Sequence, residues 1–336
     1  MISVPDRSSP LHAPLIIAHR GASGYLPEHT LEAKALAYGL GADYLEQDVV
    51  ATRDHRLVVL HDIHLDRVTD VAARFPARKR VDGRYYAVDF DLAELRQLNV
   101  HERRDASGTR AVYPKRFPTD RGTFRIPELR EEIAMLQGLN RATGRTVGLY
   151  PEVKRPAWHR EQGIDVSALL LQILEEYGYG SRRDAAWFQC FDAGELHRVR
   201  HELGSDLRLV QLLGENDWNE SATDYEYLKT AAGLREIATY ADGIGPWLGQ
   251  LYSLADIDGQ PVSSGLVSAA QTAGLAVHPY TFRADDLMPG FASFAGMLRW
   301  FVSDLGVDGL FTDFPDMARA ALDGPGAVNK NFRKEA

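Results

Sequence analysis

The pattern that decides the fold is first seen at residues 15–21, which read LIIAHRG. The first four residues are apolar and include two β-branched side chains, as is typical of a short buried strand. The run then ends in two ionisable residues, His19 and Arg20, followed by Gly21. Short apolar runs of this kind recur along the chain and alternate with longer segments of helical period. This alternation favours an α/β fold with parallel strands.

The expected strands and helices alternate along most of the chain. The strands are expected at residues 15–18, 44–50 with 57–60, 146–150, 186–189, 207–212, 242–244, 275–279 and 309–312. The segments of helical period are 28–40, 127–141, 165–177, 193–203, 234–240, 263–273, 291–305 and 315–322. About eight strand-then-helix units favour a closed (β/α)8 TIM barrel over an open doubly wound sheet. An ordinary α/β sandwich with the same insertions is the alternative.

Two stretches break the alternation. Residues 63–125 are rich in Arg, Asp and Gly and have few periodic apolar positions, while residues 214–233 are polar and aromatic. We interpret the first as a small insertion subdomain after the second strand and the second as a long loop between a strand and a helix. No linker-like boundary divides the chain, so a single domain is expected over residues 1–336.

The composition excludes several classes of protein. The 336 residues are 45% hydrophobic and 25% charged, which is too apolar for a disordered chain. The single cysteine, Cys190, excludes a disulfide within the chain. A net charge of −9 argues against binding to nucleic acid or to an anionic membrane through a broad basic surface. An anionic substrate must therefore meet local positive charge, supplied by a few Arg and Lys side chains or by a metal ion.

The sequence also bears on membrane association and export. Residues 1–14, MISVPDRSSPLHAP, are polar and interrupted by proline, and they contain no apolar run typical of a signal peptide. No later run approaches the roughly 18 to 20 uninterrupted apolar residues of a membrane span. We therefore expect no stable insertion into a membrane.

Carboxylates gather where expected strands end, which is where the chemistry of a barrel is located. Glu46 and Asp48 are two apart on one strand, so both side chains project from the same face. Glu152 follows the third strand and brings a further carboxylate to this end. Three oxygen ligands, with no cysteine and no histidine pair at zinc spacing, favour Ca²⁺ or Mg²⁺ over Zn²⁺. The alternatives are the carboxylate pair of a metal-independent glycosidase and solvated charges at a strand edge.

Two histidines follow apolar runs in the same way. His19 ends the first strand, and His61 follows the run at residues 57–60 on what we expect to be an adjacent strand. Two imidazoles suit a reaction that needs both a base and an acid near neutral pH. Arg20 and Lys154 lie beside the same strand ends and suit either charge-assisted hydrogen bonds to a phosphate or neutralisation of the carboxylates.

Longer motifs around these residues resemble those of the glycerophosphodiester phosphodiesterase family, and most closely its bacterial periplasmic branch. They are HRGA at 19–22, LPEHT at 26–30, EQDV at 46–49, HD at 61–62, LDR at 65–67, YPEVK at 150–154, QCFD at 189–192, ADGIGP at 241–246, HPYT at 278–281 and GLFTDFP at 309–315. The resemblance covers nearly the whole chain, including the insertion. Many members carry Asn where this chain has His29, so we assign His29 no catalytic role.

The resemblance implies a (β/α)8 barrel with a small insertion after the second strand. It implies hydrolysis of glycerophosphocholine, glycerophosphoethanolamine and similar diesters to sn-glycerol 3-phosphate and an alcohol, within glycerol and phospholipid catabolism. The family's metal ligands, acid/base pair and phosphate contacts map, in that order, to Glu46, Asp48 and Glu152, to His19 and His61, and to Arg20 and Lys154. The branch uses Ca²⁺, so the resemblance implies Ca²⁺ as the cofactor of this chain, and Mg²⁺ is the alternative.

The remaining expectations concern the substrate side, the partners and the compartment. Phe191, Trp247 and Tyr280 are candidates for packing against the glycerol part. The expected partner is a small-molecule glycerophosphodiester, without nucleic acid, and a homodimer is one option for the assembly. The branch favours the periplasm, while the missing export signal leaves the cytoplasm as the alternative. Three other functions stay open on the same barrel: a phosphoinositide-type phospholipase, a metal-independent glycosidase and a non-catalytic binding protein.

Overall fold

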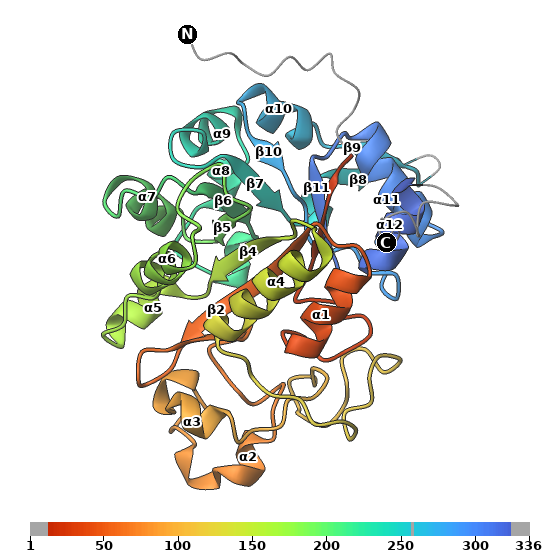
Figure 1. The fold of residues 1–336 in the computed structure, drawn as a ribbon. Helices are drawn as coiled ribbons and strands as arrows, with labels where there is room; N and C mark the ends of the chain where they lie inside the picture. Colours follow the sequence, from red (N-terminus) through yellow and green to blue (C-terminus); the bar gives the residue numbers. More distant parts are fainter. Residues whose placement is uncertain (1–12, 257–258, 324–336) are drawn as a thin grey trace.

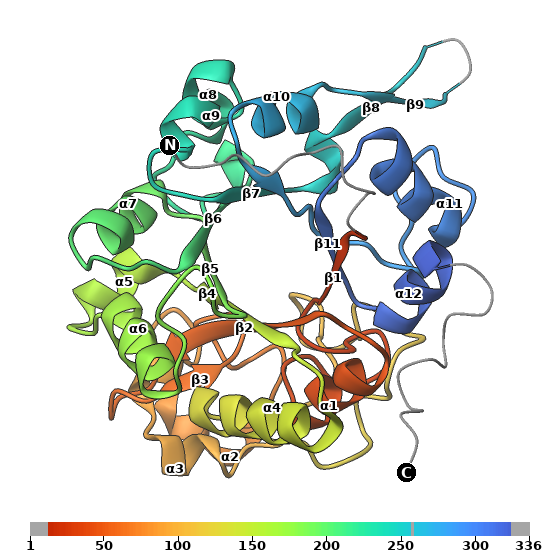
Figure 2. The ribbon, with the colours of Figure 1, turned by 45° about the horizontal axis from the view of Figure 1, so that its top comes forward.

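The computed structural model describes residues 13–256 and 259–323. Within these residues, parallel strands form a ring that Figure 2 shows end-on, with helices on its outside. In order around the ring, the strands are β1 (Leu15–Ala18), β2 (Tyr44–Ala51), β4 (Gly148–Val153), β5 (Trp187–Cys190), β6 (Arg208–Leu213), β7 (Gly243–Pro246), β10 (Ala276–Val277) and β11 (Gly309–Thr312). Backbone hydrogen bonds join β10 to β11, from Asp308 N to Val277 O and from Phe311 N to Pro279 O, each at 3.0 Å. The predicted (β/α)8 barrel is confirmed.

The outer helices overlap the segments of helical period. They are α1 (Leu31–Gly39), α4 (Leu129–Thr143), α6 (Val166–Glu176), α7 (Ala193–His201), α9 (Ala231–Ile237), α10 (Leu266–Thr272), α11 (Phe294–Arg299) and α12 (Pro315–Asp323). Two further short helices are α5 (Pro156–Glu161) and α8 (Tyr225–Leu228). Several helices begin at a side-chain cap: Thr30, Asp165 and Asp192 each accept a hydrogen bond from the backbone N–H three residues ahead.

Two local predictions about the bounds of elements were wrong. The third barrel strand continues past Tyr150 to Val153, so Pro151 and Glu152 lie within it. Pro151 lacks an N–H and resembles a strand end, yet the segment stays extended because it pairs with β2 as far as Val49. The helix expected from Ser263 begins at Leu266, because β8 (Tyr252–Leu254) and β9 (Pro261–Ser263) form a hairpin there.

The run at residues 57–60 does not form a barrel strand. Its core is β3 (Leu57–Val59), which folds back antiparallel on the far end of β2, with Val49 opposite Val59. We had expected His19 and His61 to follow adjacent strands. This prediction was wrong, because β2 lies between β1 and β3. The hairpin nevertheless returns the chain to the same end of the barrel, where Leu60 N donates to Asp48 O at 2.8 Å.

The two faces of β2 differ in what they contact. Tyr44 packs inside the barrel with Ile17, Tyr150 and Phe311, so Glu46 and Asp48, two and four residues on, face the same interior. The other face carries Gln47, whose amide donates to Glu132 of α4 at 2.8 Å. The charged partner of Glu132 is Lys34 of α1, and both side chains are fully buried. This polar cluster ties two helices to the strand that carries two of the candidate ligands.

The segment between β3 and α4 lies at the carboxyl end of the barrel. Figure 1 shows its short helices α2 (Val71–Arg74) and α3 (Leu92–Leu95) below the ring, on the side toward which the arrowhead of β2 points. Its buried apolar residues, among them Phe90 and Leu95, form a cluster that also includes Val50 of β2 and Val58 of β3. The segment is thus packed onto the barrel rather than separated from it.

The turn after β1 places His19 and Arg20 and requires a glycine. Arg20 and Gly21 both have positive φ, 60° and 92°. A Cβ on Gly21 would lie 2.8 Å from the backbone carbonyl carbon of Ala33 in α1. Only glycine fits this approach without displacing the helix.

No helix in residues 13–256 and 259–323 is long and apolar enough to cross a membrane. The N-terminal stretch examined for an export signal lies almost wholly outside the described residues, since these begin at residue 13.

Candidate functional site

A pocket of about 180 Å³ opens at the carboxyl ends of the barrel strands. Its lining includes all ten residues predicted for the site: His19, Arg20, Glu46, Asp48, His61, Glu152, Lys154, Phe191, Trp247 and Tyr280. It also includes residues that we had not assigned to the site: Gln189, Leu212, Thr281, Arg283 and Phe311. Side chains from most of the barrel strands therefore converge on one cavity.

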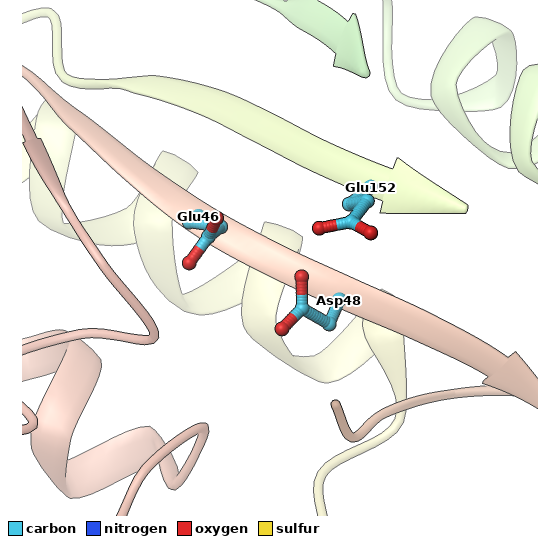
Figure 3. Close-up of side chains that lie close together, drawn as sticks. All are labelled: Glu46, Asp48 and Glu152. Carbon is cyan, nitrogen blue, oxygen red and sulfur yellow. The ribbon is translucent and has the colours of Figure 1, made fainter. Parts of the chain in front are cut away.

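The three carboxylates converge because of strand register. Asp48 of β2 pairs with Glu152 of β4, and Glu46 lies two residues earlier on the same face of β2. Figure 3 shows the three side chains on one side of the two strands. One oxygen from each lies within 4.8 Å of the others, and all three residues are buried. This spacing and these hard oxygen donors could hold a divalent cation.

Unsatisfied hydrogen-bonding capacity at Asp48 supports a cation at this point. Its Oδ2 lies 2.7 Å from Nε2 of the buried His29, which orients the carboxylate. Its buried Oδ1 has no hydrogen-bond partner among the described residues. A buried carboxylate oxygen without a partner is costly, and a metal ion would remove that cost. The residues present therefore fit a bound metal.

The pKa shifts of the three carboxylates also support a bound cation. Burial raises the pKa of Glu46 to about 8, and the nearby negative charge of Asp48 adds to the rise. Burial also raises the pKa of Glu152 well above its usual range, against the opposing charge of Lys154. Burial opposes ionisation of Asp48 too, but the hydrogen bond from His29 and the positive charge of Lys154 hold its pKa well below its usual range. Ionising all three together requires additional positive charge, which a divalent cation supplies.

His19 enters the pocket from the end of β1. Its Nδ1 lies 2.6 Å from Oδ1 of Asp313, which directly follows β11. A carboxylate can only accept, so Nδ1 carries the proton and Nε2 presents its lone pair. This Nε2 lies 3.4 Å from Oγ1 of Thr281 and 3.9 Å from Oε2 of Glu46. Burial, followed by the charge of Arg20, lowers the pKa of His19 to about 4, so the ring is neutral near neutral pH.

His61 enters from the end of the β2–β3 hairpin with the same arrangement. Its Nδ1 lies 2.5 Å from Oδ1 of the neighbouring Asp62. Its Nε2 lies 3.3 Å from Nζ of Lys154. Burial, with the positive charges of Arg20 and Lys154, lowers its pKa to about 3. Two neutral imidazoles, each held by a carboxylate at Nδ1, thus face one cavity.

Arg20 and Lys154 are the cations nearest to the carboxylates. The backbone N–H of Arg20 donates to Oε2 of Glu46 at 2.8 Å, and its guanidinium pairs with Glu28. Its buried Nε has no hydrogen-bond partner in the described part of the chain, but it lies 3.6 Å from Oδ2 of Asp48 in an ion pair. Nζ of Lys154 donates to Oε1 of Glu152 at 2.6 Å. Both side chains neutralise the acidic cluster and can also face an anion.

Aromatic side chains form one wall of the pocket. The rings of Phe191 and Tyr280 meet edge to face, with 5.9 Å between their centroids. Trp247 contacts Trp218 of the loop after β6 in a similar way, at 5.6 Å. The wall offers apolar contact area beside the charged centre.

The sequence did not indicate which side chains make hydrogen bonds to the predicted site residues. Asp313 and Asp62 lie in recognised motifs, but their bonds to the histidines depend on the fold. His29 bonds Asp48, and Gln189 donates to Oε1 of Glu46 at 3.1 Å. The register could have indicated Gln189, because it pairs with Glu152 across β4 and β5.

Residues 19–317 match the glycerophosphoryl diester phosphodiesterase family. The chain is 43% identical to a glycerophosphodiester phosphodiesterase of Haemophilus influenzae over 327 residues, covering 92% of this chain and 90% of that protein. It is 37% identical to one from Treponema pallidum over 328 residues, covering 93% and 92%. Its fold is similar to that of an Oleispira antarctica phosphodiesterase solved with the product sn-glycerol-3-phosphate, with a TM-score of 0.62, 21% identity and coverage of 93% and 98%.

Proposed function

The chain belongs to the glycerophosphoryl diester phosphodiesterase family, and from this premise we propose that it hydrolyses small glycerophosphodiesters to sn-glycerol 3-phosphate and an alcohol. Glycerophosphocholine and glycerophosphoethanolamine are the substrates we propose, within glycerol and phospholipid catabolism. The observation that carries the proposal is that a carboxylate cluster, two carboxylate-bonded histidines and two cations meet in one cavity.

We assign Glu46, Asp48 and Glu152 as ligands of a divalent metal, with Ca²⁺ as the ion and Mg²⁺ as the alternative. The support is the oxygen-only donor set and the unpartnered Oδ1 of Asp48. When bound, such an ion offsets the charge of the phosphodiester and stabilises the charge that develops on its oxygens.

His19 and His61 form the acid/base pair in this proposal. One takes the proton from the attacking oxygen as the new O–P bond forms, and the other protonates the alcohol oxygen as its bond to phosphorus breaks. Because the pKa values of both rings are low, each ring is neutral in the free site and can act as a base. The acid must hold its proton at Nε2, which the negative charge of a bound phosphodiester favours.

Two attacking groups are compatible with this pair. The glycerol hydroxyl next to the phosphate would produce a cyclic phosphate that water then opens, which makes a glycerol group part of the chemistry. Direct attack by water is the alternative. Either path needs a proton acceptor and a proton donor on opposite sides of the phosphorus.

Arg20 and Lys154 contact the phosphate oxygens in this proposal. The place of Arg20 in the pocket lining supports its role, because a guanidinium suits a charge-assisted bond to an anion. Phe191, Trp247 and Tyr280 pack against the glycerol group. The product bound in the Oleispira antarctica protein has the same glycerol and phosphate groups.

We also propose that residues 63–125 are an insertion subdomain of a single barrel domain. The support is that their apolar cluster includes Val50 and Val58, which belong to the barrel strand β2 and its hairpin partner. A periplasmic location, with the cytoplasm as alternative, and a homodimer stay predictions from the sequence.

A coupled assay for glycerol 3-phosphate tests the proposed function. The wild-type chain, supplied with Ca²⁺, is offered glycerophosphocholine, phosphatidylinositol and a chromogenic glycoside in parallel. We expect release from glycerophosphocholine and no turnover of the other two. Absence of turnover on glycerophosphocholine and glycerophosphoethanolamine with metal present would contradict the proposal, and cleavage of the lipid or the glycoside would favour the corresponding alternative.

A further inference from the structure

The two histidines of the pocket share a supporting arrangement that extends beyond the barrel. Each Nδ1 lies next to one oxygen of an aspartate, 2.6 Å away for His19 and Asp313 and 2.5 Å away for His61 and Asp62. In both cases the other oxygen of the aspartate accepts a hydrogen bond from an arginine in the insertion.

The arginine behind His61 is Arg103. Its Nη1 lies 2.7 Å from Oδ2 of Asp62. The same guanidinium donates to both oxygens of Glu28, at 2.9 and 2.6 Å, and Glu28 also accepts from Arg20. Arg103 is largely buried, with 12% of its side chain exposed. Its guanidinium is therefore fixed by two carboxylates at once.

The arginine behind His19 is Arg116. Its Nη2 lies 2.7 Å from Oδ2 of Asp313, and its side chain is 5% exposed. The guanidinium is fixed from its other side by Asp285 and by the backbone oxygen of Ser23. Asp313 also has a second arginine, since Nε of Arg283 lies 2.9 Å from Oδ2.

These contacts keep both aspartates ionised. Burial alone would raise the pKa of each, but the charge of Arg103 holds that of Asp62 well below its usual range. The charge of Arg283, the hydrogen bond from His19 and the charge of Arg116 do the same for Asp313. An ionised carboxylate can only accept, so it requires the proton of each imidazole to be on Nδ1.

We propose that Arg103 and Arg116 are positioning residues, through which the insertion sets the ring orientation and the tautomer of His61 and His19. Their role in turnover rests on the proposed function; their role in the state of the rings does not. Without its arginine, each aspartate can rotate away from the imidazole and toward solvent. The imidazole can then carry its proton on either nitrogen. The insertion thus completes a site whose other groups come from the barrel.

The two arms of the arrangement differ in a way that the experiment can use. Asp313 keeps Arg283 when Arg116 is removed, whereas no second arginine bonds Asp62 within residues 13–256 and 259–323. We therefore expect Arg103→Ala to affect His61 more than Arg116→Ala affects His19. Arg80→Ala is the matched control, because Arg80 makes a two-bond pair with Asp89 inside the insertion, at 2.7 Å for each bond, and Asp89 contacts neither histidine.

Nitrogen NMR of ¹⁵N-histidine-labelled protein reads the ring state without any substrate. The signals of His61 and His19 are assigned by their loss in His61→Asn and His19→Asn. We expect protonated Nδ1 and unprotonated Nε2 for both rings in the wild type. Arg103→Ala should convert His61 to mixed tautomers and leave His19 unchanged, Arg116→Ala should shift His19 only, and Arg80→Ala should shift neither.

Steady-state kinetics supply the second readout. We expect Arg103→Ala to lower kcat about 10- to 100-fold with little change in KM, and Arg116→Ala to lower it less. Millimolar guanidinium should restore part of the activity of Arg103→Ala, because it can occupy the vacated position, and should restore none to His61→Asn. Arg80→Ala should retain wild-type kcat.

The outcomes separate this inference from the proposed function. Unchanged tautomers in well-folded Arg103→Ala would overturn the inference, whatever the activity. If the arginine variants change the tautomers as expected but the wild-type protein hydrolyses no glycerophosphodiester, the proposed function is overturned. The inference about the rings then stands. A uniform loss of melting temperature and activity in all three arginine variants, with no rescue, would show a structural role only and overturn positioning.

Discussion

Nζ of Lys154 lies 3.3 Å from Nε2 of His61 while it also donates to Oε1 of Glu152 at 2.6 Å. A single cation therefore joins a candidate acid/base group to the candidate metal cluster. Because the proton of His61 is on Nδ1, its Nε2 lone pair accepts from Lys154 in the free site. An anion that binds Lys154 would release this lone pair for proton transfer.

We predict that replacing either histidine removes most of the turnover and little of the metal binding. His19→Ala and His61→Ala should each lower kcat at least about 100-fold, because each removes one proton-transfer group. His64→Ala is the control, since His64 is near His61 in the chain but packs against Tyr86 away from the pocket. Near wild-type kcat in either pocket variant would make the acid/base assignment wrong.

We predict that Glu152→Gln weakens metal binding. An amide keeps the shape of the carboxylate but loses the charge that attracts a divalent cation, so Ca²⁺ affinity should fall at least about 10-fold. Isothermal titration of the metal-stripped protein measures it. Glu175→Gln, on the exposed side of α6, should bind like the wild type. Equal affinity in both variants would remove Glu152 from the ligand set.

We predict that stability falls as the pH rises because of Glu102. Burial raises the pKa of this side chain to about 8, and its Oε2 has no partner among the described residues. The folded state therefore holds a proton that the unfolded state loses at about pH 4 to 5. Between about pH 5 and about pH 8 this linkage lowers the free energy of unfolding.

The test compares the free energy of unfolding in urea of Glu102→Gln and of the wild type, at about pH 5 and at about pH 8. The free energy of unfolding of the variant, relative to that of the wild type, should rise by on the order of 1 to 3 kcal/mol from the lower to the higher pH, since Gln cannot ionise. Glu175→Gln should show no such gain. A pH-independent difference would mean that Glu102 ionises in the folded protein as readily as in the unfolded chain.

We predict that Gly21→Ala destabilises the protein by about 2 kcal/mol or more, because φ is 92° and the added Cβ meets the backbone of Ala33. Gly39→Ala should instead stabilise by up to about 1 kcal/mol, since Gly39 is in α1 and nothing lies within 4 Å of its Cβ position. Thermal unfolding measures both. Similar stability in the two variants would contradict the account of the turn after β1.

The barrel and the composition of the pocket could be predicted from the sequence because both follow short-range rules. A period of two places Glu46 and Asp48 on one face whatever the partner strand is. Apolar runs that end in polar residues mark the carboxyl ends of the strands, which is why His19 and Lys154 could be assigned to one end of the barrel.

The features of the fold and the site that could not be predicted depend on contacts between distant parts of the chain. The bond between His19 and Asp313 joins residues 294 positions apart, and no local pattern specifies it. β3 resembles a barrel strand in composition, and its antiparallel pairing with β2 is decided by a tight turn that has positive φ at His55. Arg103 and Arg116 lie in a segment of weak periodicity, where the sequence indicates charge but not which carboxylate each residue meets.

Metal-dependent hydrolysis is tested most directly by a Ca²⁺ titration of the metal-stripped chain in the presence of glycerophosphocholine, with glycerol 3-phosphate release followed by ³¹P NMR. We expect no release before metal is added and full activity once the cluster of Glu46, Asp48 and Glu152 is filled. Asp48→Asn, which changes the oxygen left without a partner, should need far more Ca²⁺. Steady release of glycerol 3-phosphate in the presence of excess chelator, or no release at saturating metal, would show that this site is not a metal-dependent glycerophosphodiesterase.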